Sequence, residues 1–240
     1  MSSSVEGWVA YQIANAPLRR YPYDHIYVEE VFEPVFYTRM RAMLPPDSAY
    51  REIQETGRVR KGLYRERFVI DLHEKSLPAL PPALAVFWQT VADTLLCREV
   101  LDAVLYRFDA REWLGRPLST TLSLMRDKSG YGIGPHTDAG NKIATLLFYL
   151  PADGENEHLG TSIYLPRDPS TRVKSNKHYD YKDFRRIYTA PFRPNTLFAF
   201  ARSDRSFHGV EPIEAPGVTR DLLILNIKMP PQDMEKARGH

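Results

Sequence analysis

Residues 196–229, TLFAFARSDRSFHGVEPIEAPGVTRDLLILNIKM, contain three short apolar runs separated by turns rich in Ser, Asp, Gly and Pro. Three similar runs precede this stretch. The six candidate strands cover residues 118–126, 143–150, 162–165, 196–201, 207–212 and 222–229. Short runs with turn residues between them are typical of an antiparallel sandwich or barrel. The pattern therefore predicts a mostly β protein with a jelly-roll core over residues 116–230.

The residues before this core follow helical patterns. The apolar residues of segment 36–43 recur at helical spacing, and a Pro-Pro pair at 45–46 ends that pattern. A second helix is predicted to begin near Pro82, because proline is tolerated in a first turn. Residues 54–66, between the two helices, are polar and basic and are predicted to form a loop.

A long polar segment, residues 167–191, interrupts the β pattern of the core. Long segments without secondary structure of their own are usually functional or disordered in a compact domain. We predict a lid-like insertion here, with a solvated surface loop as the alternative. A chain of 240 residues with an all-β core usually forms one domain. The N-terminal helical part, residues 1–115, and the core are therefore predicted to form a single domain.

The composition excludes several classes of protein. A net charge of +2 provides no electrostatic argument for binding nucleic acid or a membrane surface. No apolar run is long enough to cross a bilayer, and the first residues lack the basic and apolar regions of a signal peptide. The single cysteine, Cys97, excludes an internal disulfide and a cysteine-based metal site. These features predict a cytoplasmic protein without nucleic-acid or membrane partners, and they do not predict an oligomeric state.

His136, Thr137 and Asp138 form a His-x-Asp motif just after a glycine-rich turn and just before the run 143–150. Residues i and i+2 of an extended strand point the same way, so one short segment supplies two ligands. A non-haem iron site of this kind needs two neutral imidazoles and one carboxylate on one face of the metal. The motif therefore predicts a metal site that a histidine from another strand completes.

A second His-x-Asp motif, His178 to Asp180, provides an internal comparison. The chain has 7 His and 30 Asp or Glu, so a pair of this kind also arises by chance. His178 lies in the polar insertion without a strand pattern around it, whereas His136 lies between a turn and an apolar run. We therefore assign the ligands to His136 and Asp138 and interpret His178 as a solvated loop residue.

His208 and Arg220 are polar residues in apolar candidate strands. His208 lies in the run 207–212 and is predicted to be the third metal ligand. Counting in twos from Arg220 places Leu222 and Ile224 on its face of the strand. An arginine on an inward face needs an anion. The carboxylate of a bound ligand, held by a bidentate pair, and an internal Asp or Glu would both serve.

The order of these parts resembles the Fe(II)/2-oxoglutarate-dependent dioxygenase superfamily, and is most similar to its prolyl-hydroxylase-like branch. The shared pattern is a His-x-Asp motif, a distal His and then an Arg. The resemblance extends over residues 118–229 and includes the segments 142–150, 160–164, 194–200 and 203–212.

The resemblance implies a double-stranded β-helix in which His136, Asp138 and His208 bind Fe(II) and are the catalytic centre. It also implies that Arg220 pairs with the distal carboxylate of 2-oxoglutarate. Tyr149 matches a tyrosine that hydrogen-bonds the same carboxylate in relatives, and an ordinary core aromatic is the alternative for it.

Two further residues are candidates for the pocket. Arg126 lies ten residues before His136, where relatives often have an inward polar residue, so it is expected to serve co-substrate or substrate. A surface arginine at a strand end is the alternative. Asn226 lies on the predicted face of Arg220 and is a candidate for lining the pocket.

The implied activity is hydroxylation of an unactivated C–H bond in a small molecule, and the sequence leaves desaturation and ring closure open as alternatives. Co-substrates are 2-oxoglutarate and O2, products are succinate and CO2, and ascorbate would keep the iron ferrous. Related halogenases carry Gly or Ala in place of the carboxylate, so Asp138 favours oxygen transfer. Many prolyl 4-hydroxylases have Lys at the position of Arg220, so the resemblance does not imply that this protein shares their substrate. The alternatives are a prolyl-type hydroxylase of protein side chains and a cupin-like binder of metal or sugar without catalysis.

Overall fold

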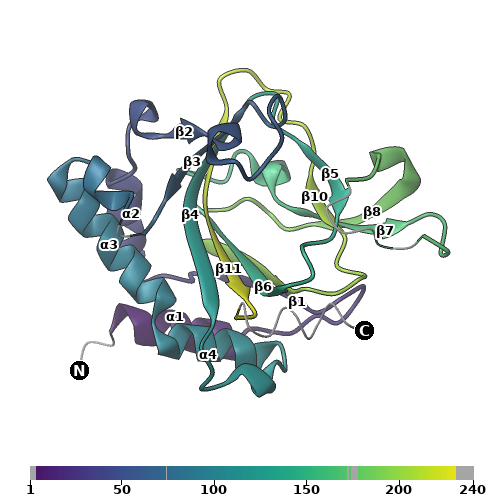
Figure 1. The fold of residues 1–240 in the computed structure, drawn as a ribbon, viewed down its shortest axis with the longest axis horizontal. Helices are drawn as coiled ribbons and strands as arrows, with labels where there is room; N and C mark the ends of the chain where they lie inside the picture. Colours follow the sequence, from purple (N-terminus) through teal and green to yellow (C-terminus); the bar gives the residue numbers. More distant parts are fainter. Residues whose placement is uncertain (1–3, 74, 172, 174–177, 231–240) are drawn as a thin grey trace.

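The computed structural model describes residues 4–73, 75–171, 173 and 178–230. Two antiparallel β-sheets face each other, and helices cover the outer side of the larger sheet (Figure 1). The order of the larger sheet is β1-β9-β6-β11-β4-β3-β2, and that of the smaller sheet is β5-β10-β7-β8. The predicted fold class, mostly β with N-terminal helices, is confirmed.

The strands of the larger sheet are β1 (His25–Glu29), β2 (Arg51–Glu52), β3 (Arg67–Asp71), β4 (Ser119–Lys128), β6 (Lys142–Tyr149), β9 (Thr196–Ala201) and β11 (Thr219–Lys228). Those of the smaller sheet are β5 (Ile133–His136), β7 (Ser162–Pro166), β8 (Phe184–Thr189) and β10 (His208–Val210). The six predicted strands correspond to β4, β6, β7, β9, β10 and β11.

The helices are α1 (Val5–Asn15), α2 (Pro34–Ala42), α3 (Pro82–Leu96) and α4 (Arg98–Arg107). Short 3-10 turns are η1 (Asp47–Ala49), η2 (Ile53–Thr56), η3 (Leu77–Ala79), η4 (Arg111–Trp113), η5 (Glu157–Leu159) and η6 (Tyr181–Asp183). Helices α2 and α3 match the predictions, whereas α1 and α4 were not predicted. Among the described residues, no helix combines the length and apolar character needed to span a bilayer.

Alternate residues of β11 pack into two different cores. Leu223 and Leu225 are buried against the helices, whereas Leu222 and Ile224 belong to the core between the sheets. Side chains of a strand point alternately to its two faces. The same alternation directs Arg220 toward the smaller sheet, as the period of two predicts.

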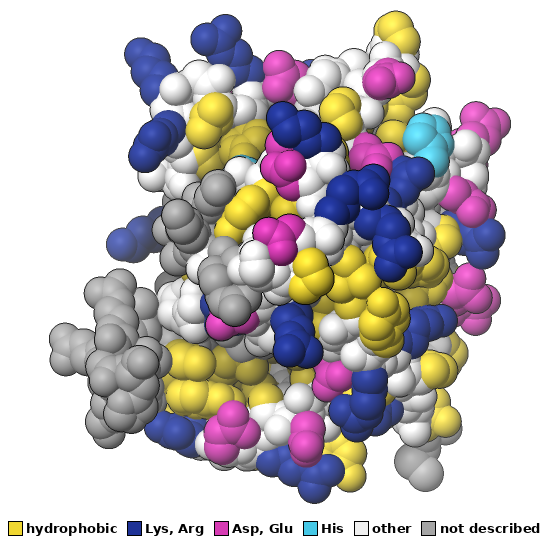
Figure 2. All heavy atoms as spheres, turned by 90° about the vertical axis from the view of Figure 1, so that its right-hand side faces the viewer, with side chains coloured by type: hydrophobic (Ala, Val, Ile, Leu, Met, Phe, Trp, Pro, Cys, Tyr) yellow, Lys and Arg dark blue, Asp and Glu magenta, His cyan; other side chains and the backbone are white. Residues whose placement is uncertain are grey.

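The polar segment 167–191 is partly built into the smaller sheet. Its residues 184–189 form β8, which pairs with β7, and Phe184 is buried in a small cluster with Tyr164 and Phe207. The expectation of a segment without secondary structure is therefore wrong for its second half, while its residues 172 and 174–177 lie outside the described part. Figure 2 shows the face on the side of β7 and β8, where basic and acidic side chains are interspersed with apolar patches.

Candidate metal centre

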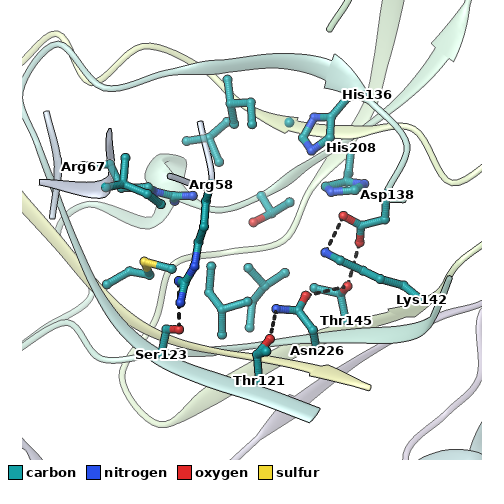
Figure 3. A pocket seen from close by; sticks show the side chains of 18 of the residues that line it. Arg58, Arg67, Thr121, Ser123, His136, Asp138, Lys142, Thr145, His208 and Asn226 are labelled. Carbon is teal, nitrogen blue, oxygen red and sulfur yellow. Dashed lines mark hydrogen bonds and ion pairs between the residues drawn. The ribbon is translucent and has the colours of Figure 1, made fainter. Parts of the chain in front are cut away.

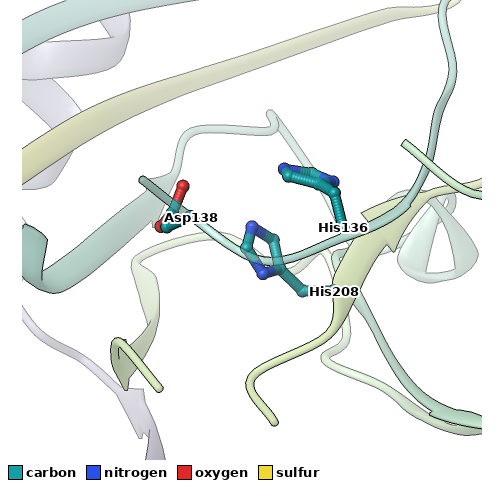
Figure 4. A group of neighbouring side chains, drawn as sticks. All are labelled: His136, Asp138 and His208. Atoms are coloured by element: carbon teal, nitrogen blue, oxygen red, sulfur yellow. The ribbon is translucent and has the colours of Figure 1, made fainter. Parts of the chain in front are cut away.

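The three predicted metal ligands meet beside the smaller sheet. His136 ends β5, His208 begins β10, and these two strands pair antiparallel with His208 opposite His136. Asp138 lies two residues beyond β5. One donor atom from each residue lies within 4.8 Å of the others, and the three side chains point toward one another (Figure 4). Strand pairing thus brings together groups that are far apart in the sequence.

Both imidazoles are oriented by backbone carbonyls. Nδ1 of His136 lies 2.9 Å from the carbonyl oxygen of Gly134, and Nδ1 of His208 lies 2.9 Å from that of Ser206. A carbonyl oxygen only accepts, so Nδ1 carries the proton in each ring and Nε2 keeps its lone pair for a metal. Histidine ligands of metals are commonly held by such outer contacts.

The carboxylate of Asp138 is held by two donors. Lys142 Nζ donates to Oδ1 and Thr145 Oγ1 donates to Oδ2, each at 2.6 Å. Burial by itself would raise the pKa of Asp138, but Lys142 and then the two histidines outweigh it and hold the pKa below its usual range. Thr145 Oγ1 also lies 3.4 Å from Asn226 Oδ1, and Asn226 Nδ2 donates to Thr121 Oγ1 at 3.1 Å (Figure 3). Asp138 is therefore an ionised, oriented candidate ligand.

The charge states of the group fit a divalent metal. Burial lowers the pKa of His136 well below its usual value, and neighbouring His208 lowers it further. Burial also lowers the pKa of His208. Two neutral imidazoles and one carboxylate are the donor set of mononuclear non-haem iron sites. Since metal ligands must be deprotonated, the three residues fit Fe(II) without rearranging their protons.

Gly209 allows β10 to approach β5 at the level of the histidines. A Cβ at this position would lie 2.6 Å from the carbonyl oxygen of Ile133, which is part of the paired backbone. Overpacking of this kind typically costs about 1–3 kcal/mol. We therefore expect Gly209→Ala to lower the free energy of unfolding by about that amount and to weaken metal binding, as measured by urea denaturation and metal titration.

Gly140 provides the matched control. It lies two residues beyond Asp138, and a Cβ there would meet nothing closer than 3.9 Å. Gly140→Ala should therefore leave both stability and metal affinity nearly unchanged. Equal effects of the two substitutions would show that the close approach at Gly209 does not hold the histidines in place.

The second His-x-Asp motif also reaches this site. The His178 ring lies 4.7 Å from the His136 ring, and its Nδ1 is hydrogen-bonded to the Tyr64 hydroxyl. The backbone N–H of Tyr179 donates to the carbonyl oxygen of Pro135 at 2.9 Å, which attaches this segment to β5. The interpretation of His178 as a solvated loop residue is therefore wrong in part, because the exposed side chain lies against the candidate ligand His136.

A cavity of about 320 Å³ between the sheets adjoins the three ligands. Arg58, Arg67, Lys142, Arg220 and Lys228 contribute the basic part of its lining. Its volume falls in the range of small-molecule sites. The candidate metal centre thus opens onto a space of the right size for a co-substrate or a small substrate.

Arg220 is completely buried, and its guanidinium lines this cavity. Its Nη1 lies 2.8 Å from Asp127 Oδ2, its Nε donates to the carbonyl oxygen of Leu159 at 2.6 Å, and its Nη2 to Thr161 Oγ1 at 3.2 Å. Arg67 forms a bidentate pair with the same Asp127, at 2.6 and 2.8 Å. Two guanidinium groups therefore share one buried carboxylate, which leaves one positive charge in excess at the cavity wall.

No protein-family model matches the sequence, and no curated protein matches it significantly. Several solved structures match the fold. A prolyl-4-hydroxylase from Pseudomonas putida superposes with a TM-score of 0.51 at 13% identity, over 92% of this chain and 99% of the other. The non-haem 2-oxoglutarate-dependent carbocyclase SnoK from nogalamycin biosynthesis gives 0.52 at 14% identity, over 99% and 90%. The 2-oxoglutarate-dependent epimerase SnoN from the same biosynthesis gives 0.52 at 13%, over 92% and 81%.

The chain has the fold of the 2-oxoglutarate-dependent oxygenases. The resemblance noted in the sequence is thereby confirmed at the level of the fold, a double-stranded β-helix. In this oxygenase fold the cavity lies between the two sheets, and the His-Asp-His group forms part of its lining.

The oxygenase fold also places Tyr149 beside Arg220. Tyr149 is fully buried, and the Arg220 guanidinium lies 5.5 Å from its ring centroid. The hydroxyl accepts a hydrogen bond from the backbone N–H of Thr161 at 2.9 Å. Tyr149 is thus adjacent to the excess positive charge, although its side chain is not part of the cavity lining.

Arg126 is not brought to the cavity of the oxygenase fold. Its neighbours on β4, Ser123 and Met125, line the cavity, and side chains of a strand alternate between its faces. Arg126 points to the opposite face, where its Nε donates to Asp221 at 2.7 Å and its Nη1 contacts Asp47. The expectation that Arg126 serves a ligand is therefore corrected: it is a structural ion-pair residue.

Sequence reasoning missed Arg58, Arg67 and Lys228 as residues of the cavity. Lys228 continues the alternation of Arg220 and Asn226 along β11, so its place on the cavity face was readable from the period of two. Arg58 lies in the segment predicted as a loop, and Arg67 follows it directly. Only pairing of β3 with β4 brings Arg67 opposite Asp127, and no local pattern indicates it.

Proposed function

We propose that this protein is an Fe(II)- and 2-oxoglutarate-dependent oxygenase that hydroxylates a C–H bond of a small molecule, with release of succinate and CO2. The observation that carries the proposal is the pre-oriented His136, Asp138 and His208 group beside a cavity that also contains a buried arginine. These three residues would hold the iron. The bound iron, with 2-oxoglutarate and O2, supplies the oxidising power, and ascorbate would keep it ferrous.

Arg220 is proposed to bind the distal carboxylate of 2-oxoglutarate. The Arg67–Asp127–Arg220 group has an excess positive charge inside the protein, and a carboxylate would neutralise it. Charge-assisted hydrogen bonds of a guanidinium to a carboxylate are among the stronger ones in proteins. Tyr149 lies against the same guanidinium and would restrict its orientation.

The position of the cavity between the two sheets favours a small-molecule substrate over a protein side chain. SnoK and SnoN are enzymes of nogalamycin biosynthesis, and the Pseudomonas putida protein is a prolyl-4-hydroxylase. A cavity between two sheets suits a small molecule better than an extended peptide, so prolyl-type hydroxylation is the second candidate. A binder of metal alone would have no use for Arg220, which counts against the cupin-like alternative.

The proposal is tested by anaerobic titration of the metal-free protein with Fe(II) and 2-oxoglutarate, following the visible metal-to-ligand charge-transfer band. Loss of a charged hydrogen bond typically costs about 1.5–3 kcal/mol, or about 10- to 150-fold in affinity. We expect Arg220→Lys to weaken 2-oxoglutarate binding by that factor. Lysine keeps a charge beside Asp127 but cannot form a bidentate pair.

Arg20→Lys is the matched control, because the Arg20 side chain is 73% exposed and lies outside the cavity lining. It should bind 2-oxoglutarate as the wild type does. Absence of the band in folded, iron-loaded wild type would exclude the oxygenase function. A band with unchanged 2-oxoglutarate affinity in Arg220→Lys would exclude only the role of Arg220.

A further inference from the structure

The cavity has two basic ends that lie far apart along β11. Arg220 is near the start of this strand and Lys228 is its last residue. Eight residues of extended strand correspond to about 26 Å. Asn226 lies between them, opposite Thr145, whose hydroxyl donates to Asp138. The metal ligands are therefore level with the Asn226 end, and Lys228 lies beyond them, well away from the proposed 2-oxoglutarate arginine.

Two lysines face each other at this end. Lys228 on β11 is the cross-strand partner of Lys142 on β6, next to a bulge in the pairing. Like charges directly opposite each other destabilise a sheet. Lys142 is paired with Asp138 at 2.6 Å, whereas Lys228 has no carboxylate within 4.0 Å among the described residues. A half-buried ammonium without a carboxylate partner would be stabilised by an anion bound beside it.

Arg58 adds a guanidinium to the cavity wall at the level of Ser123, the register partner of Ile224, midway along β11 between Arg220 and Lys228. Its guanidinium contacts Asp71 and Ser123, the latter at 3.4 Å, and Figure 3 shows it extending into the cavity toward Ser123. Asp71 itself is buried and also bonded to Arg51 at 2.8 Å. These contacts hold Arg58 at the cavity wall, and a positioned guanidinium suits planar or tetrahedral anions.

The charges of the lining are unbalanced. Among the described residues that line the cavity, Asp138 is the single acid, and it is assigned to the metal. Burial and then Lys142 and Arg58 lower the pKa of Lys228, and the carboxylate of Asp138 only partly opposes them. Arg58 is paired with buried Asp71 and Lys142 with Asp138, so the excess positive charge on the substrate side resides on Lys228.

We propose that the primary substrate carries an anionic group, a carboxylate or a phosphate-type dianion, which binds between Lys228 and Arg58 and presents the rest of the molecule to the metal centre. The identification of the bound molecule as the substrate rests on the proposed function. The anion site itself is inferred from the residues that line the cavity. The anion removes the repulsion between the paired lysines. It also fixes one end of the substrate. The distance from the anionic group then determines which carbon atom lies at the metal centre and reacts.

The test measures binding of inorganic sulfate and of acetate to the metal-free protein, and again with Mn(II) and 2-oxoglutarate present, by calorimetry. We expect Lys228→Met and Arg58→Met each to weaken binding of the preferred anion about tenfold or more. Lys228→Arg should retain it. Preference for sulfate indicates a phosphate-type group, and preference for acetate indicates a carboxylate.

Lys75→Met is the control, because Lys75 is exposed and lies outside the cavity lining. Without anions, Lys228→Met should be at least as stable as the wild type, since it removes the lysine–lysine repulsion. Absence of binding to the wild type, or equal binding to Lys228→Met, would overturn the proposal. So would binding that is lost on adding 2-oxoglutarate and is insensitive to Lys228, because the anion would then occupy the Arg220 end.

The charge-transfer titration distinguishes this failure from failure of the proposed function. A band without anion binding leaves an oxygenase whose substrate is not recognised by charge. Anion binding that depends on Lys228, without a band, supports the anion site and excludes the oxygenase activity.

Discussion

Replacing Asp138 by alanine is expected to lower the affinity for Fe(II) by more than about 100-fold, which exceeds the 10- to 100-fold loss typical of outer-sphere partners. Asp138 supplies the single anionic donor of the group, and its carboxylate is already ionised and oriented by Lys142 and Thr145. The variant retains two neutral imidazoles but leaves Lys142 without its partner, so positive charge replaces negative charge beside the metal. Anaerobic calorimetric titration with Fe(II) measures the effect.

The chain contains its own control for this experiment. Asp180 belongs to the second His-x-Asp motif, and its side chain is 53% exposed. Asp180→Ala should bind Fe(II) as the wild type does. Thr145→Val, which removes one hydrogen bond to Asp138, should show an intermediate loss of about 10- to 100-fold. If Asp138→Ala bound Fe(II) with the affinity of the wild type, the metal would bind at a site that does not include Asp138.

Replacing Asp127 by alanine is expected to lower the free energy of unfolding by about 3–5 kcal/mol, the typical cost of breaking a buried ion pair on one side. Asp127 and Arg220 are fully buried, and Arg67 is 13% exposed. The three residues form one row across β3, β4 and β11, because Asp127 is the register partner of both arginines. Without the carboxylate, two guanidinium groups are left uncompensated inside the protein.

Chemical denaturation with a constant m-value measures this loss. Asp47→Ala is the comparison, because Asp47 also contacts two cations, Arg126 and Lys128, but is 60% exposed. An exposed ion pair contributes about 0–1 kcal/mol. If Asp127→Ala lost no more stability than Asp47→Ala, the buried row of charges would not stabilise the fold, and the excess charge inferred at Arg220 would lack its structural basis.

The local sequence was sufficient for the parts of the site that depend on strand periodicity. Two residues of a His-x-Asp motif at a strand end supply two ligands, and counting in twos from Arg220 selects the inward residues of β11. The same rule distinguishes Arg126 from Asp127, because adjacent residues of a strand point to opposite faces of the sheet. It was not applied to Arg126, which was instead assigned by likeness to relatives, and this is where the prediction was wrong.

Contacts between segments distant in the sequence were decided by the tertiary structure alone. The sequence by itself determined a mostly β fold, a candidate set of metal ligands and an inward arginine, because these depend on residue type and on the period of a strand. The register of β3, β4 and β11 determined that Arg220 shares Asp127 with Arg67. Pairing of β11 with β6 set Lys228 against Lys142, and the insertion carried His178 to His136. Such pairings depend on long-range packing, for which no local pattern carries information.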